Sequence, residues 1–470
     1  MENFSNALKH LRKKPLPCDE PELRKVASQF VTPFYLYDKQ KIITGAKHFN
    51  DSFAWVQSLT GSSFRNHFAV KATPTPKIMK MLYEDCGMGM DCSSLTELLL
   101  CEKLGIKGED IIFTSNNTPF KAYRKAFDMG AIVNLDDFSQ IDNMKKALAG
   151  KMPNVISFRY NPGPYQNITH NLFIGDPVES KYGMTKSQLF SAYKKCREYG
   201  VTRFGLHTML VSDSFNILDL AEVARMMFSL AVEIKRETGI AVEFVDLGGG
   251  IGVNYRPEDE PIDLGDLGQQ VKRLYEEIVL PHTDLHPLQI KYECGTLVTV
   301  DCGWLVSRVI NMKDTYKRFL GVDASMADLM GPSVFGMYNH ITIVKDQAIP
   351  NHLREDLPDY KTVVNNPSYA CPNYEGNKRE KMFDVVGSLC INIDKFAIDR
   401  ELNEHPEIGD LCIIHSAGAY GRSESFNFNG KLRHAEILRV AENCFEVICD
   451  AETCENYFAL LKFPGECIHL

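Results

Sequence analysis

The chain has 470 residues, enough for two or three domains of about 100–200 residues each. Hydrophobic residues make up 44% of it, which supplies a full core and excludes a disordered chain. Its 52 basic and 61 acidic residues give a net charge of -9, so the chain lacks the positive field that nucleic-acid binding needs.

Short β-type segments alternate with amphipathic helical segments after the N-terminal arm. The segments are apolar, β-branched or aromatic, and end in small or polar residues, which is typical of buried parallel strands. In chain order the eight predicted strands are 66–71, 87–92, 110–115, 131–136, 155–161, 203–209, 243–249 and 290–295. Helices are predicted over 76–85, 94–105 and 221–239, the last with Gly239 as its C-cap. Eight such repeats predict an α/β protein with a (β/α)8 barrel.

Strands without intervening helices follow from about residue 304, and they predict an all-β domain. These segments are 303–314, 317–323, 337–345, 383–389, 410–418 and 431–449. The strand-like segment 31–38 is expected to join them, and Asn429-Gly430 is interpreted as a hairpin turn. The stretch 349–380 is predicted to be a surface insertion. The expected domains are therefore a barrel over 39–303 and a β-domain made of 1–38 with 304–470.

The fourteen cysteines carry little information as a group. No C-x-x-C pair and no Cys/His cluster with metal spacing occurs, so we expect free thiols in a reducing compartment and no metal. Residues 1–22 lack the apolar core of a signal peptide, and no run of about 18 apolar residues exists. A cytoplasmic protein without a membrane partner is expected.

Polar residues and glycines stand at the ends of six predicted barrel strands, where barrels carry their active sites. They are Lys71, Asp91, Arg159, His207, Gly248-Gly249-Gly250 and Glu293. Each has an ordinary interpretation: a solvated lysine, a core histidine, a turn of glycines. Their shared edge favours one site over six coincidences.

One ligand accounts for all these groups, and it is pyridoxal phosphate. Lys71 would form a Schiff base with it, and the glycines, Gly248, Gly249 and Gly250, would approach its phosphate. Glu293 would keep the pyridine nitrogen protonated, and His207 would stack on the ring. A protonated pyridine is a strong electron sink, which favours α-decarboxylation. Asp91 and Glu97 would balance the nearby positive charge.

The motifs around these residues resemble the pyridoxal-phosphate-dependent decarboxylases of the diaminopimelate/ornithine type. They are F-A-V-K-A at Lys71, M-D-C-S-S-L-T-E at 90–97, S-K-Y-G-M at 180–184, V-D-L-G-G-G at 245–250, E-C-G at 293–295, G-V-D-A-S-M at 321–326, A-G-A-Y-G at 417–421 and N-x-N-G at 427–430. The resemblance is greatest to diaminopimelate decarboxylase and covers about residues 30–460. It implies an alanine-racemase-like barrel, a C-terminal β-domain, and a homodimer whose active sites are shared between subunits.

The same resemblance implies roles for the β-domain. The motif at 387–394 keeps Cys390, which would protonate the substrate carbon in the partner's site, and Asp394. Tyr420 would reach the cofactor phosphate from across the interface. Cys390, Lys71 and His207 are thus the expected catalytic residues.

Several positions depart from the family pattern. Ser416 stands where the usual D-A-G-A-Y motif begins with aspartate, and four further departures concern the substrate. Thr296 and Gly331 replace arginines that bind substrate carboxylates, Phe335 replaces a tyrosine, and Ile391 replaces a glutamate that recognises a distal ammonium. Each lost arginine removes charged hydrogen bonds of about 1.5–3 kcal/mol each. A decarboxylase with an altered amino-acid substrate is therefore expected.

Three alternatives stay open at this point. The chain could be a genuine meso-diaminopimelate decarboxylase that makes L-lysine, with Arg159 or Arg422 substituting for the missing arginines. It could be a non-catalytic homologue that binds pyridoxal phosphate, although such proteins usually lose the lysine or the glutamate. A racemase of related barrel type would carry arginine at the pyridine nitrogen, and Glu293 argues against it.

Overall fold

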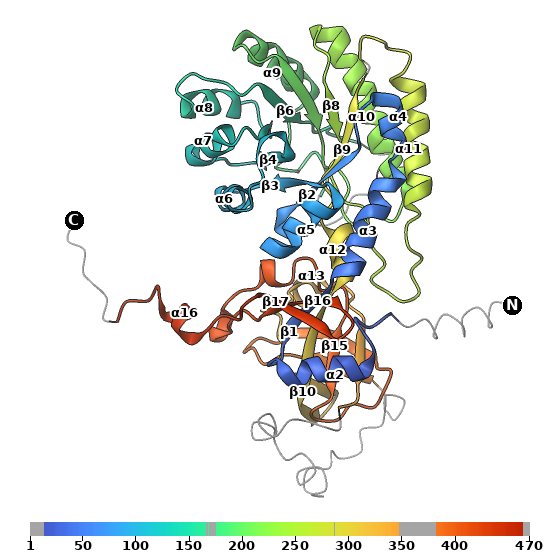
Figure 1. Ribbon diagram of the computed structural model, residues 1–470, viewed down its shortest axis with the longest axis vertical. Helices are drawn as coiled ribbons and strands as arrows, with labels where there is room; N and C mark the ends of the chain where they lie inside the picture. The colour runs from blue at the N-terminus through green and yellow to red at the C-terminus, as the bar shows by residue number, and fades with distance from the viewer. Residues whose placement is uncertain (1–13, 166–167, 169–174, 286, 347–381, 464–470) are drawn as a thin grey trace, which may run out of the picture. The chain divides into compact units, whose positions relative to one another are not determined.

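The computed structural model describes residues 14–165, 168, 175–285, 287–346 and 382–463 (Figure 1). The predicted insertion at 349–380 lies outside these residues. The chain divides into two compact units. We call the first, Lys41–Asn254 with Glu260–Thr299, the barrel unit. The second takes the described parts of Met1–Gln40, Tyr255–Asp259 and Val300–Leu470, and we call it the sheet unit.

A closed barrel of eight parallel strands forms the first unit, which confirms the predicted (β/α)8 fold. The strands are β2 (Arg65–Ala69), β3 (Gly89–Cys92), β4 (Ile111–Ser115), β5 (Ile132–Leu135), β6 (Val155–Arg159), β7 (Arg203–His207), β8 (Phe244–Asp246) and β9 (Gln289–Tyr292). Each predicted strand segment contains or overlaps one of them. Because all run in parallel, their carboxyl ends meet at one mouth.

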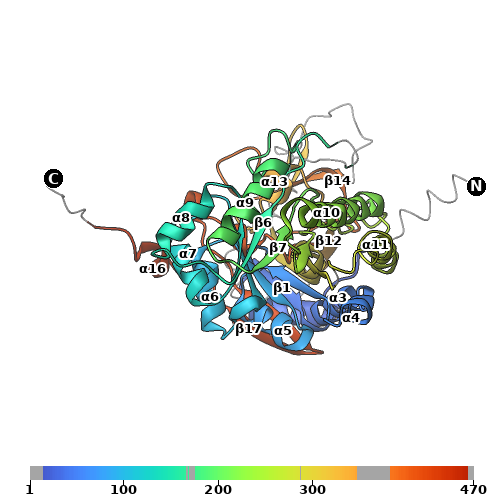
Figure 2. The ribbon, with the colours of Figure 1, turned by 90° about the horizontal axis from the view of Figure 1, so that it is seen from above.

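Helices surround the barrel strands, as the view in Figure 2 shows. They are α3 (Lys39–Ser52), α4 (Trp55–Thr60), α5 (Pro76–Cys86), α6 (Leu95–Lys103), α7 (Phe120–Asp128), α8 (Gln140–Ala147), α9 (Lys186–Glu198), α10 (Ile217–Thr238) and α11 (Leu264–Ile278). The short helix α12 (Thr296–Thr299) follows β9. Asn216 caps the start of α10 through a hydrogen bond to the Leu218 N–H, and Gly239 ends it with a left-handed φ of 72°. The predicted C-cap is therefore correct.

Glycine at two strand positions makes room for large side chains in the barrel. The ring of Phe244 occupies the space that a Cβ at Gly205 would need, and the ring of His67 does the same at Gly89. Ile112, Ile132 and Val155 pack with Phe244 in one buried cluster. These four side chains form an apolar layer inside the barrel.

The sheet unit is built around one nine-stranded mixed sheet. Its strands are β1 (Phe34–Asp38), β10 (Gly303–Asp314), β11 (Arg318–Val322), β12 (Ile341–Val344), β13 (Met382–Val386), β14 (Lys395–Glu401), β15 (Leu411–Ile414), β16 (Glu436–Ala441) and β17 (Cys444–Cys449). The helices α2 (Glu20–Gln29), α13 (Gly331–Phe335) and α16 (Cys454–Phe458) belong to the same unit. β1 pairs with β10 and β16, as expected for the segment 31–38.

Two details of this unit differ from the sequence-based expectation. The prediction of a hairpin turn at Asn429-Gly430 is wrong, because Phe428–Gly430 forms a 3-10 turn and the hairpin between β16 and β17 turns at Glu442-Asn443. β14 was not predicted, because its sequence KFAIDRE carries four charges around a run of only three apolar residues. No helix in the described ranges is long and apolar enough to cross a membrane.

Candidate active site

The register of four neighbouring barrel strands, β6 to β9, aligns a row of polar residues. Arg159 pairs with His207, His207 with Asp246, and Asp246 with Lys291. Paired residues of parallel strands direct their side chains to the same face. All four are buried, with at most 9% of each residue exposed. The barrel therefore carries an unusually polar row near the carboxyl ends of its strands.

His207 and Glu293 form a hydrogen-bonded pair in this region. His207 Nε2 lies 3.1 Å from Glu293 Oε2, and both side chains are more than nine-tenths buried. His207 Nδ1 and Glu293 Oε1 have no hydrogen-bond partner among the described residues. Burial alone would raise the pKa of Glu293, but the His207 contact and the charges of Lys71 and Arg159 hold the pKa below its usual range. Glu293 is thus an ionised carboxylate with one oxygen left for a ligand.

Asp246 joins this pair and was missed by the sequence analysis. It is 1% exposed, its Oδ1 accepts the Gly248 N–H at 2.9 Å, and its Oδ2 has no hydrogen-bond partner among the described residues. One oxygen of Asp246, one of Glu293 and one nitrogen of His207 lie within 4.8 Å of one another. Such a group could hold a metal ion, but the His207–Glu293 hydrogen bond already joins two of its members, and the absence of a metal stays a prediction. The aspartate that precedes the glycine triplet was the available signal.

The glycine triplet packs against neighbouring backbone. Gly248 and Gly250 have left-handed φ values of 72° and 84°, which disfavour residues with side chains. A Cβ at Gly248 would meet the Thr208 carbonyl, one at Gly249 the Glu293 carbonyl, and one at Gly250 the Val211 carbonyl. Because these three residues lack side chains, the backbones of the loops that follow β7, β8 and β9 can pack closely against one another.

Lys71 lies in a 3-10 turn, Val70–Ala72, directly after β2. Its charge acts on Asp91, Glu97 and Glu293, and lowers the pKa of each against the rise that burial causes. Asp91 lies within β3, is 4% exposed and keeps Oδ1 without a described partner. Glu97 Oε2 accepts the Ser93 N–H at 2.5 Å at the start of α6. The structure thus brings the predicted lysine near three carboxylates.

Arg159 is engaged within the barrel unit. Its guanidinium lies 3.4 Å from Asp136 and stacks on the Tyr182 ring at 4.2 Å. It lines a pocket together with Asn161, Tyr182 and Leu210. Its positive charge is therefore already matched by a carboxylate and an aromatic face.

Cys390 lies in the sheet unit on the exposed loop 387–394. Asp394 fixes this loop, because its carboxylate accepts the Met326 N–H at 2.6 Å and the Leu389 N–H at 2.8 Å. The Cys390 N–H donates to Asn429 Oδ1 at 3.0 Å. The Asn-Gly pair that resembled a hairpin turn therefore positions the cysteine loop.

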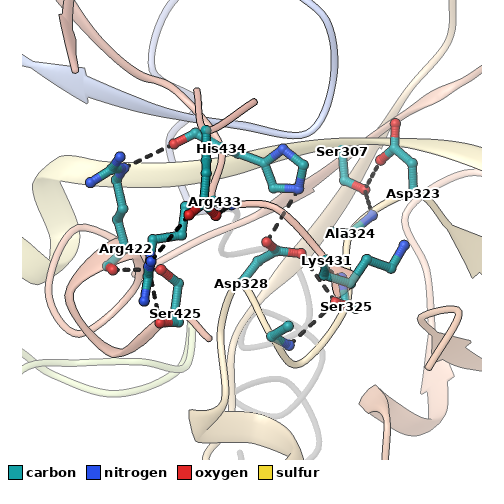
Figure 3. A network of polar contacts seen from close by, with 12 residues as sticks. Ser307, Asp323, Ala324, Ser325, Asp328, Arg422, Ser425, Lys431, Arg433 and His434 are labelled. Carbon is teal, nitrogen blue, oxygen red and sulfur yellow. Dashed lines mark hydrogen bonds and ion pairs between the residues drawn. The ribbon is translucent and has the colours of Figure 1, made fainter. Parts of the chain in front are cut away.

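A network of polar contacts in the sheet unit joins Asp328, Arg422 and His434 (Figure 3). His434 Nε2 lies 3.3 Å from Asp328, and the Arg422 Nε–H donates to the His434 carbonyl at 3.0 Å. Burial raises the pKa of Asp328 to about 7 and lowers that of His434 to about 4, so a neutral imidazole makes this contact. Arg422 also donates to the Asp450 carbonyl. Both candidate substitutes for the missing arginines, Arg159 and Arg422, are thus engaged with the protein itself.

The remaining predicted residues are divided between the units. Thr296 begins α12 in the barrel unit. Gly331 and Phe335 begin and end α13 in the sheet unit, and Phe335 and Ile391 are each 39% exposed. Tyr420, also in the sheet unit, is half-buried with a left-handed φ of 57°.

Comparison with known families agrees with this geometry. Residues 46–299 match the model of the pyridoxal-dependent decarboxylases, pyridoxal binding domain. Protein TabA of Pseudomonas amygdali pv. tabaci is 34% identical over 93% of each chain. The diaminopimelate decarboxylase of Methanothermobacter thermautotrophicus is 28% identical over 91% of each chain.

Solved structures share the same fold. Diaminopimelate decarboxylase from M. jannaschii superimposes with a TM-score of 0.80 at 24% identity, covering 94% of each chain. The Helicobacter pylori enzyme in complex with L-lysine gives a TM-score of 0.77 at 24% identity, covering 93% of this chain and 98% of that one. At this identity the likeness concerns the arrangement of the elements.

Proposed function

Because the chain belongs to the pyridoxal-dependent decarboxylases, we propose that it removes CO2 from an amino acid other than meso-diaminopimelate. It is a carboxy-lyase that uses pyridoxal phosphate. One observation carries the change of substrate: the residues for the cofactor are kept, whereas those for the distal part of the substrate are replaced by Thr296, Gly331 and Ile391.

The buried groups of the barrel unit fit the cofactor. Glu293 Oε1 and His207 Nδ1 are unpartnered polar atoms in the described structure, and buried polar atoms are normally satisfied by a ligand or water. Glu293 would hold the pyridine nitrogen, His207 would lie on the ring, Lys71 would bind the aldehyde carbon, and the 248–250 loop would face the phosphate. When bound, the cofactor supplies the sink for the electron pair that remains after CO2 departs.

The protein's own groups would control the charge and the proton. Ionised Glu293 would stabilise the positive charge of the ring nitrogen, and the charge of Lys71 acts on the carboxylates of Asp91 and Glu293. We assign to Cys390, on its Asp394-fixed loop, the proton delivered to the substrate carbon. Its exposure supports this assignment, because the thiol is accessible to a second chain.

Two observations favour the altered substrate over diaminopimelate. Phe335 and Ile391 present apolar side chains at positions that carry polar groups in the family pattern. Arg159 and Arg422 are engaged with Asp136 and with backbone carbonyls, so neither is available as a new carboxylate clamp. An uncharged or weakly polar distal group would suit such a site.

The first test concerns Lys71. Borohydride treatment of the holoenzyme should fix the cofactor to the peptide that contains Lys71, which mass spectrometry would identify. The Lys71→Ala variant should lose the reducible chromophore, whereas Lys47→Ala, on α3, should keep it. Retention of the chromophore in Lys71→Ala would refute the assignment.

The second test concerns the substrate. CO2 release should be measured with meso-diaminopimelate, lysine, ornithine, arginine, glutamate and larger amino acids. We expect a kcat/KM for meso-diaminopimelate about 100-fold or more below that of the best substrate, because two charged clamps are missing. Turnover of meso-diaminopimelate at the highest rate of the panel would instead identify a lysine-forming enzyme.

A further inference from the structure

Two buried carboxylates lie at the ends of neighbouring barrel strands: Asp246 ends β8, and Glu293 directly follows β9. Asp246 and Glu293 face each other, and the side chains are almost completely withdrawn from water. Two buried carboxylates whose oxygens lie within 4.8 Å cannot both be ionised at low cost, because their charges repel in a medium that screens weakly. One of the pair therefore holds a proton at neutral pH.

The surroundings decide which carboxylate is ionised. Glu293 receives the His207 hydrogen bond and faces the charges of Lys71 and Arg159. Burial and the nearby carboxylates of Glu293 and Asp91 disfavour the ionised form of Asp246. The Gly248 N–H and the charge of Lys291 favour it. Burial raises the pKa of Asp246 well above its usual range. Burial also lowers the pKa of Lys291, so the positive charge that Lys291 offers to Asp246 is less favoured.

We propose that Asp246 is a positioning residue, which stays protonated and donates a hydrogen bond from Oδ2 to the Glu293 carboxylate while Oδ1 accepts the Gly248 N–H. The carboxyl group then links the glycine loop after β8 to the glutamate after β9. It leaves a single negative charge on the pair and fixes the oxygen, Oε1, that has no partner among the described residues. This proposal depends on the proposed function in one respect: Glu293 is the residue that would bind the cofactor.

Asparagine has the shape of a protonated aspartate and offers the same donor and acceptor. Asp246→Asn should therefore retain kcat/KM and cofactor affinity within about threefold, whereas Asp246→Ala, which removes both hydrogen bonds, should lose about tenfold or more in each. Equal loss in the two variants would overturn the proposal, because it would show that an ionised carboxylate is needed.

A second measurement uses the apoprotein and needs neither cofactor nor substrate. Unfolding exposes Asp246 to water, where its pKa is about 3.9, so a native protonated group releases a proton on unfolding above that pH. Wild-type stability should fall relative to Asp246→Asn as the pH rises from 5 to 8, and the difference in melting temperature should widen steadily.

The matched control is Asp142→Asn. Asp142 is exposed on α8, and its hydrogen bond to Lys195 lowers the pKa, so it is ionised throughout this range. Its difference from wild type should stay constant between pH 5 and 8. A constant difference for Asp246→Asn as well would overturn the proposal, even if Asp246→Ala failed to fold. Failure of the Lys71 labelling would leave this result unaffected, so the two hypotheses fail separately.

Discussion

At the residue scale, two buried carboxylates of the barrel unit have different neighbours, and these neighbours shift their pKa values differently. Glu293 and Asp246 are both buried, yet His207 and two cations act on the first, while the second meets mainly burial and Glu293 itself. Their pKa values therefore move in opposite directions, which is how one site can hold an ionised and a neutral carboxyl group at the same pH.

The cysteine in the sheet unit provides a test at this scale. Cys390→Ala should leave the absorbance of the bound cofactor unchanged and lower kcat about 100-fold or more, because a positioned proton donor is lost. Cys444→Ala removes another exposed thiol and should behave as wild type. Unchanged product formation by Cys390→Ala would remove this cysteine from the mechanism.

Asp394 should matter for stability as well as for rate. Asp394→Ala leaves the N–H groups of Met326 and Leu389 without their acceptor, which should lower the free energy of unfolding by about 2–4 kcal/mol. Asp394→Asn keeps only one of the two acceptor oxygens, so it should lower the free energy of unfolding by about half as much as Asp394→Ala. Urea denaturation measures both, and equal stability of Asp394→Ala and wild type would contradict the role of this loop anchor.

At the scale of elements, the loops after the strands are as constrained as the strands themselves. The bridge between Ser214 and Ile251 and the bond from the Ser214 N–H to the Gly250 carbonyl at 2.9 Å tie the β7 and β8 loops together. This close approach explains why three successive glycines stand there.

Two glycines of the barrel unit should respond oppositely to alanine. Gly250→Ala combines a left-handed φ with a collision at the Val211 carbonyl and should cost about 3 kcal/mol or more, with loss of cofactor affinity. Gly45→Ala lies in the exposed part of α3 with open space around it and should stabilise the protein by up to about 1 kcal/mol. Denaturant titration measures both; a tolerated Gly250→Ala would show that the loop can move.

At the scale of the whole molecule, the sheet unit carries a group of exposed apolar side chains. Val334, Phe335, Ile391, Ile393 and Phe428 are each 39–47% exposed. After α16, Leu460 is 90% exposed and Phe463 76%. Exposed apolar groups in such number are typical of surfaces that a partner covers. We propose a second copy of this chain as that partner.

Light scattering should test this assembly. We expect a particle of twice the chain mass of 53.2 kDa, and a Leu460→Asp/Phe463→Asp variant should weaken the dimer at least about tenfold. Val178→Asp alters an exposed apolar residue of the barrel unit and serves as the control. A monomeric wild-type protein would contradict the proposal.

The amino-acid sequence by itself determined the barrel, the order of its strands and the edge where polar residues gather, because hydrophobic periodicity and glycine endings are local signals. Lys71, His207 and Glu293 could be named because parallel strands must end on the same side. Motif order was equally readable, and it pointed to the family that the comparisons show.

Only the tertiary structure decided what touches these residues. The approach of Asp246 to Glu293, the contact of Asn429 with the Cys390 loop, and the engagement of Arg159 by Asp136 join positions that are distant along the chain. Strand register, burial and close packing create these contacts, and none of them leaves a local periodic pattern. The sequence therefore showed which chemistry was present, while the fold decided which carboxylate is ionised and which charges are already matched.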